Sequence, residues 1–378
     1  MIELQTYLVY ALLFITMFIL AKIASERNEW FWMVLGILIY SIVFGMRYGV
    51  GVDHLSYMTE YQRVSSTSIV LYDDTESGFR FIRDTLAQGG AHVAIYFGLI
   101  AFLQLWLVFK AVKSDRVIYP YLVISFFLGC IWLTYANGLR QQLAFCIFAY
   151  SLLFVNKKLL PLHYILIILA VSMHQSAVLL LVIAPLLMIK KDWFTNTKIQ
   201  YMLFATAIIV GQLPQIESWL VNSEGQLTFL GGFLEETGYD GYYEYKDGEA
   251  IFKEVGTGGI GYYIELIINI ILIRFCNDIK LFNKDNKLVT YMYNLAFIGI
   301  LSHYLFISSP ALSRINYYFY GFAFIFGAYA LHYLYEKHKS MFYTLLSLYI
   351  LTFIGTMYKM FDNTSAFYFL WQSDIYGK

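Results

Sequence analysis

The stretch LLPLHYILIILAVSMHQSAVLLLVIAPLLMI, residues 159–189, decides the fold class. It is apolar for about 31 residues, whereas one helix that crosses a membrane needs about 20. Polar side chains interrupt it near its middle, at Ser172, His174, Gln175 and Ser176. We therefore predict two short membrane helices that meet at His174.

Apolar runs of membrane-spanning length recur on both sides of this stretch. Together with the pair that meets at His174, they predict about twelve transmembrane helices in a single integral membrane domain, residues 1–378. No small-residue cleavage site follows the first run, so we expect it to be an anchor and not a removed signal. The runs are 6–22, 30–46, 92–109, 117–136, 138–155, 199–214, 259–276, 288–309, 313–335 and 341–360.

The composition supports an all-α polytopic membrane protein. Hydrophobic residues make up 59% of the 378 residues and charged residues 14%, against about a quarter charged in soluble proteins. The 26 basic residues balance the 26 acidic ones, so no global positive field indicates nucleic acid as a partner. Cys130, Cys146 and Cys276 lie singly in or at the end of apolar runs. Without metal-ligand spacing, we expect them to be small core residues.

The distribution of lysine and arginine predicts the orientation. Basic residues concentrate in alternate short loops, which should therefore face the cytoplasm. Two long segments, 47–91 and 215–258, lie on the opposite side, and the second is acidic. We predict that both are loops on the outer side of the membrane. The tyrosines of 215–258 either form a lid or binding surface, or anchor the loop at the membrane interface.

Two arginines lie where a helix dipole disfavours them. Arg140 follows a tight turn at 135–138, and Arg314 follows a capping sequence at 308–310, so each lies in the first turn of an inward-running helix. A cation at the positive end of the dipole lowers stability unless an anion compensates. Two such sites on one membrane face suit a diphosphate. The alternative is that each arginine snorkels to the interface or pairs with a loop carboxylate.

Three more residues are candidates for chemistry. Asp53 follows Arg47 through a glycine-rich turn, and it could act as a general base on a sugar hydroxyl. A purely structural Arg47–Asp53 salt bridge is the alternative. His174 lies at the helix break, where an imidazole can accept a proton, orient a phosphate oxygen or simply satisfy neighbouring backbone groups.

Four short motifs stand in order along the chain, namely RYGVGVD at 47–53, GLRQQLA at 138–144, HQSA at 174–177 and SRINYY at 313–318. Together they resemble the signature of the EpsG family, a branch of the Wzy-type polysaccharide polymerases of bacterial inner membranes. The similarity runs from about residue 30 to residue 335, and the chain departs from the family in its long acidic segment 215–258.

The resemblance implies a glycosyltransferase of the bacterial inner membrane whose active site faces the periplasm. The growing glycan on undecaprenyl diphosphate would be the donor, and the non-reducing sugar of a lipid-linked repeat unit would be the acceptor. Paired arginines could replace a metal ion, so we expect no metal and no cofactor. Membrane lipids surround the chain, and a chain-length regulator is a candidate partner.

The resemblance and the residues together assign roles. The two arginines Arg140 and Arg314 would bind the leaving diphosphate. Asp53 is the first candidate for the general base and His174 the second. Arg47 would orient Asp53 or bind an acceptor phosphate. Tyr317 and Tyr318 would stack on sugar rings.

Other classes of protein share some of these features. An O-antigen ligase-like transferase would also place arginines around a lipid-linked diphosphate, but it would transfer the glycan to a different acceptor. A lipid-linked oligosaccharide flippase also fits twelve spans and a broken helix, but it should carry polar groups through to both faces. A membrane acyltransferase is disfavoured because no cytoplasmic-side His lies near an Asp or Asn.

Overall fold

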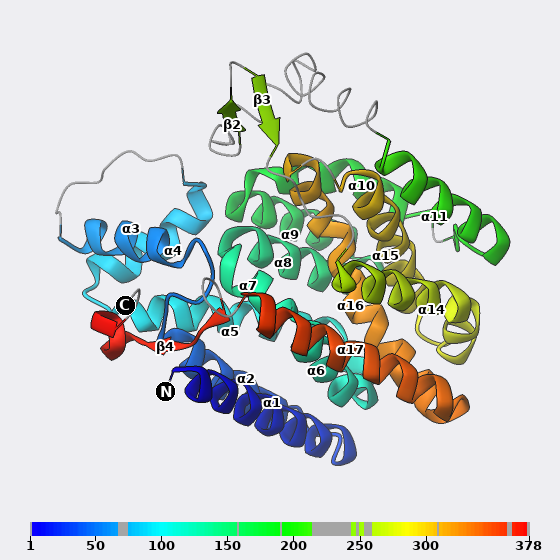
Figure 1. The fold of residues 1–378 in the computed structure, drawn as a ribbon, viewed down its shortest axis with the longest axis horizontal. Helices are drawn as coiled ribbons and strands as arrows, with labels where there is room; N and C mark the ends of the chain where they lie inside the picture. The colour runs from blue at the N-terminus through cyan, green and yellow to red at the C-terminus, as the bar shows by residue number, and fades with distance from the viewer. Residues whose placement is uncertain are drawn as a thin grey trace. The chain divides into compact units, whose positions relative to one another are not determined.

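The computed structural model describes residues 2–66, 75–156, 159–189, 191–213, 243–246, 249–252, 259–307, 310–360 and 365–375. Almost all of these residues are helical (Figure 1). The sequence predicts one membrane domain, and the structure divides the chain into two compact units, residues 1–189 with 327–378 and residues 190–326. The long helix α16 (Pro310–Lys337) belongs to both.

The first unit is a bundle of helices that pack side by side. Helix α1 packs on α2 and α6, α2 packs on α5, and α5 packs on α8, which packs on α9 (Figure 1). Its elements are α1 (Ile2–Glu26), α2 (Trp30–Gly45), β1 (Arg47–Tyr48), α3 (His54–Ser66), α4 (Ser77–Gln88), α5 (Val93–Ala111), η1 (Lys113–Ile118), α6 (Tyr119–Leu128), α7 (Ile131–Asn137), α8 (Leu139–Asn156), α9 (Leu160–Met173), η2 (Gln175–Val178), α10 (Leu179–Leu187), α17 (Lys339–Met360), β4 (Tyr368–Phe369) and η5 (Leu370–Ile375).

The predicted break at His174 is confirmed. Helix α9 ends at Met173, His174 has an extended backbone, and η2 begins at Gln175. The apolar run 117–136 differs from a straight span, because its two helical parts are bent by 68°. Cys130, at the bend, has a left-handed backbone with φ of 56°, which a continuous right-handed helix cannot contain.

Among the described residues, five helices are long and apolar enough to cross a membrane, namely α1, α5, α14, α15 and α17, and the bent α6–α7 pair counts as a sixth if it is one span. Five further apolar helices are shorter. Twelve spans therefore remains a prediction. The apolar side chains that α1 exposes need lipid around them, and they are Leu4, Leu8, Leu12, Ile15 and Ile19.

The segment 47–91, predicted to be a loop, contains two helices. Helices α3 and α4 pack against each other, and α4 also packs against α9. Their buried faces carry Tyr57 and Phe79, while polar residues alternate with them, so both are amphipathic surface helices. Within 215–258, only strands β2 (Tyr243–Lys246) and β3 (Glu249–Phe252) belong to the described residues.

The C-terminal segment returns to the start of the chain. Strand β4 pairs antiparallel with β1, so that Arg47 lies opposite Phe369. The Tyr10 hydroxyl of α1 donates to the Ser365 carbonyl at 2.7 Å. These bonds fix the chain at the end of α2, where the candidate site begins.

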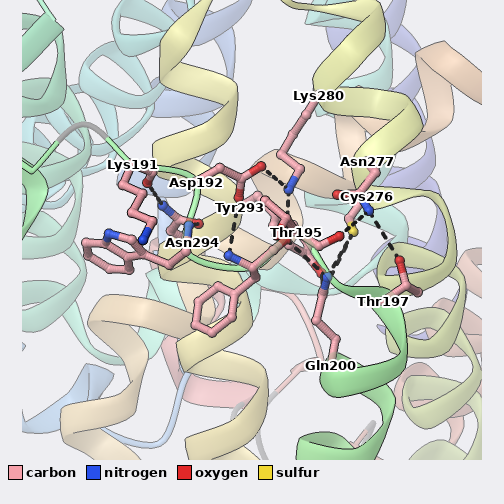
Figure 2. Close-up of polar contacts among 12 residues, drawn as sticks. Lys191, Asp192, Thr195, Thr197, Gln200, Cys276, Asn277, Lys280, Tyr293 and Asn294 are labelled. Atoms are coloured by element: carbon pink, nitrogen blue, oxygen red, sulfur yellow. Dashed lines mark hydrogen bonds and ion pairs between the residues drawn. The ribbon is translucent and has the colours of Figure 1, made fainter.

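The second unit packs α11 (Thr197–Gly211), α14 (Ile260–Phe282) and α15 (Lys287–Leu305) together. The connection before α11 is held by a polar cluster (Figure 2). Lys280, only 8% exposed, donates to the Asp192 carboxylate at 2.6 Å and to the Phe194 carbonyl at 2.9 Å. The Tyr293 hydroxyl donates to Gln200. Since a buried charge needs partners, this cluster explains how the lysine is tolerated.

All three cysteines are buried and free. They pack as small core side chains, which confirms the prediction made from their isolated positions in apolar runs.

Candidate active site

The glycine-rich turn after α2 brings Asp53 to the beginning of α8. Gly49 and Gly51 have φ of 73° and 93°, which other residues rarely adopt. A Cβ atom on Gly51 would also lie 3.1 Å from the Ala136 carbonyl oxygen. The Asp53 N–H donates to the Asn137 side chain at 2.9 Å. The turn is therefore fixed three residues before Arg140.

Arg47 does not pair with Asp53, which corrects that part of the prediction. Its guanidinium donates to three carbonyl oxygens, of Phe44 at 2.8 Å, Ala136 at 3.1 Å and Val50 at 3.4 Å. The Phe44 carbonyl lies at the end of α2, where backbone acceptors lack helical donors. Burial lowers the pKa of Arg47 to about 10, so it stays charged at neutral pH. Arg47 is buried, and through these carbonyl groups it stabilises the turn.

Glu76 is the centre of the candidate site. Its Oε2 accepts a hydrogen bond from Arg140 Nη1 at 2.7 Å. Its Oε1 lies 3.2 Å from His174 Nδ1 and accepts from the Gln175 backbone N–H at 3.0 Å. The site therefore joins the start of α4, the start of α8 and the break between α9 and η2.

The electrostatics keep Glu76 ionised. Burial opposes its charged form, but the hydrogen bond from His174, the charge of Arg140 and the Gln175 N–H outweigh that burial and lower the pKa of Glu76 to about 2. The carboxylate thus compensates the arginine at the positive end of α8. In the structure Arg140 therefore pairs with a carboxylate of the segment 47–91, the pairing that the sequence leaves open as an alternative to binding a diphosphate.

The same carboxylate selects the tautomer of His174. Nδ1 lies 3.2 Å from Glu76 Oε1 and 3.4 Å from the Ser176 N–H. An ionised oxygen at the shorter distance favours a proton on Nδ1, which His174 then donates to Glu76. Nε2 is left as the proton acceptor of the ring. This relation between carboxylate and imidazole is the one that orients a general base in hydrolytic triads.

A close approach of two helices places Glu76. It stands at the N-terminal cap position of α4 without bonding that helix end through its side chain. Two residues later, a Cβ on Gly78 would lie 2.6 Å from Met173 Cε and 2.9 Å from Ser172 Cβ. Only glycine allows α4 to pack this closely against the end of α9.

Tyr57 completes the surroundings of Arg140. Its hydroxyl is hydrogen-bonded to Arg140, and its side chain is nearly buried. The Arg140 side chain nevertheless keeps 34% of its surface exposed. It is therefore paired on one side and accessible on another, as an anion-binding arginine must be.

The structure thus brings three predicted residues, Asp53, Arg140 and His174, to one end of the first unit. The sequence reasoning missed Glu76 and Tyr57. The unfavourable position of Arg140 at the start of a helix indicates that a carboxylate should compensate its charge. The sequence does not show which acidic residue does so.

The other predicted residues lie on α16. Arg314 falls in the first turns of this helix, and its side chain is outside the described residues. Tyr317 is 38% exposed, whereas Tyr318 is completely buried. Stacking of Tyr318 on a sugar is therefore wrong for this structure, because neighbouring helix positions point in different directions.

The fold and the site define a multi-pass membrane protein with an arginine, a carboxylate and an imidazole gathered at a helix break. The family model that matches is the EpsG family, over residues 29–373. The chain therefore belongs to the EpsG family, the family of Wzy-type polysaccharide polymerases. No curated protein and no solved structure matches the chain.

Proposed function

We propose that the chain is a polysaccharide polymerase that works on the periplasmic face of the inner membrane. It transfers the growing glycan from undecaprenyl diphosphate to the non-reducing sugar of a lipid-linked repeat unit. Membership of the EpsG family supports the reaction class. The observation that carries the assignment of residues is the bridge that Glu76 forms between Arg140 and His174.

The proposed step is a single displacement at the anomeric carbon of the donor. The acceptor hydroxyl oxygen forms the new glycosidic bond, and the bond from that carbon to the diphosphate oxygen breaks. The hydroxyl proton goes to Nε2 of His174. The electron pair of the broken bond leaves on undecaprenyl diphosphate.

Each residue acts where charge develops. Arg140 binds the diphosphate as its negative charge increases. Glu76 is a positioning residue, since it holds the guanidinium and fixes the tautomer of His174. Asp53, at the adjacent turn, is the alternative base. We assign Arg314 as the second arginine for the diphosphate and Tyr317 as a stacking surface for sugar.

The test is the surface-glycan profile of the source bacterium after deletion of the gene. Restoring the wild-type gene should give a long ladder, and restoring Arg140→Ala should leave single-repeat glycan, because the leaving group is no longer stabilised. Arg63→Ala is the matched control, an exposed arginine of α3 in the same unit, and should restore the ladder.

Two outcomes would overturn this assignment. A full ladder with correctly folded Arg140→Ala protein would remove Arg140 from the reaction. Loss of even the single repeat after gene deletion would favour the flippase or the ligase-like transferase.

A further inference from the structure

A second glutamate–histidine pair lies in the second unit. Glu265 of α14 lies 2.9 Å, through Oε1, from Nε2 of His303 on α15. The same Oε1 accepts from the Tyr320 hydroxyl of α16 at 2.6 Å. Three helices therefore direct polar groups at one carboxylate oxygen.

This pair keeps acceptor atoms available. In the neutral ring, with Nε2 protonated toward the carboxylate, Nδ1 of His303 carries the lone pair. Within the described part of the chain, neither this Nδ1 nor Glu265 Oε2 has a recorded hydrogen-bond partner. The side chains of His303 and Glu265 are 28% and 35% exposed. A pair needed only for packing would be expected to be closed off from ligands.

Aromatic rings surround these acceptors. The Tyr320 ring stacks on the His303 ring, with centroids 4.7 Å apart and planes within 10°. Asn269 donates to the hydroxyls of Tyr320 at 3.4 Å and Tyr304 at 3.3 Å, which fixes both rings. Tyr317 lies three residues before Tyr320 and therefore on the same side of α16, with 38% of its surface exposed.

The charge of the cluster decides the class of ligand. Among the side chains that the structure describes, no hydrogen bond or ion pair of Glu265, His303 or Tyr320 involves a lysine or an arginine. Within these contacts a diphosphate would therefore meet a carboxylate with no lysine or arginine beside it. Sugar hydroxyls instead donate to carboxylate and imidazole acceptors, and the C–H faces of sugar rings pack on tyrosines.

We propose that Glu265, His303, Tyr317 and Tyr320 form a saccharide-binding site that takes the hydroxyl groups of a glycan through Glu265 Oε2 and His303 Nδ1. The expectation that this glycan is the repeat unit rests on the proposed polymerase function. The site itself requires no diphosphate and no catalytic step.

The test uses the repeat-unit oligosaccharide released by mild acid from the lipid-linked pool of the deletion strain. Binding to the full chain in lipid nanodiscs is measured by saturation-transfer NMR over a concentration series. Glu265→Gln should raise the dissociation constant at least about 10-fold, as expected for loss of a charged hydrogen-bond acceptor. Tyr320→Phe, which removes one hydroxyl and keeps the ring, should give a smaller loss.

Asp278→Asn is the matched control. This carboxylate lies on the same helix α14, is exposed and pairs only weakly with Arg274 at 3.6 Å, so oligosaccharide binding should not change. Only variants whose thermal unfolding midpoint equals that of wild type are compared. Equal binding by wild type and Glu265→Gln, or no binding by wild type, would overturn the proposal.

Arg140→Ala separates this site from the proposed reaction. It should bind the released oligosaccharide like wild type while failing to elongate the glycan. If Arg140→Ala elongates normally but Glu265→Gln still loses binding, the polymerase mechanism is wrong and the saccharide site stands.

Discussion

The two glutamate–histidine pairs differ in the third group that each glutamate holds. In the first unit, Glu76 holds His174 and the guanidinium of Arg140. In the second unit, Glu265 holds His303 and the hydroxyl of Tyr320. In both, the carboxylate takes one ring nitrogen and leaves the other as a proton acceptor. The third partner is a cation in one pair and a neutral hydroxyl in the other. On this difference rest our proposals of a site for an anion and a site for neutral hydroxyls.

The first prediction tests whether His174 and Glu76 act as one unit. His174→Gln should lower the elongation rate by about 10²–10⁴-fold, the usual contribution of a general base. Glu76→Gln should lower it by about 10-fold or more, because the tautomer and the arginine are no longer fixed. The double variant should be no slower than about the His174 variant alone, since effects within one catalytic unit are not additive.

The measurement is the initial rate of chain extension with purified protein and lipid-linked repeat unit. The pH–rate profile is recorded as well, because Glu76→Gln should change its shape while a distant structural change would not. If the rate losses of the two single variants multiply in the double variant, His174 and Glu76 act independently. The comparison with the Glu265–His303 pair would then fail.

The second prediction sharpens the contrast in charge. Inorganic diphosphate should bind the first site through Arg140, and Arg140→Ala should weaken binding by about 10–100-fold, the usual value of one charge-assisted contact. Glu265→Gln should leave diphosphate binding unchanged. Calorimetric titration of nanodisc-embedded protein measures both. Loss of diphosphate binding in Glu265→Gln would mean that the second pair also serves an anion.

The sequence predicts the framework of this molecule well, because apolar runs and polar interruptions are local signals. The break at His174 follows from the four polar residues at 172–176. Each of the other apolar runs corresponds to one helix, except 117–136, which forms two helical parts bent by 68°. The helices in 47–91 were missed because α3 and α4 are short and polar on one side. Their pattern is too weak to be distinguished from a loop.

The partners of the candidate residues could not be predicted, because they are distant in the chain. Glu76 lies 64 residues from Arg140, and its position depends on the close packing that Gly78 permits. His303 lies in an apolar run, and nothing local shows that Glu265 faces it. The sequence alone does not distinguish Tyr317 from Tyr318. The packing of α16 buries Tyr318, whereas Tyr317 stays 38% exposed.

The last prediction concerns how much the ionised Glu76 of the first pair stabilises the fold in acid. It is the smallest of the three expected effects. The pKa of Glu76 is lowered to about 2 in the folded chain, whereas a free glutamate titrates near 4.3. A lowered pKa stabilises the fold above the free value, and the stabilisation is lost as pH falls from about 4.3 through about 2. The gain at neutral pH should be on the order of 1–3 kcal/mol.

The comparison of wild type with Glu76→Gln isolates this contribution. The difference in unfolding free energy, measured by denaturant titration in detergent, should shrink as the pH falls from 6 to 2.5. His174 faces the same carboxylate, so the experiment is repeated in a His174→Gln background, where Arg140 is the cation on Glu76. A difference that stays constant with pH would mean that Glu76 is not ionised between its two partners. The comparison between a charged and a neutral pair would then lose its basis.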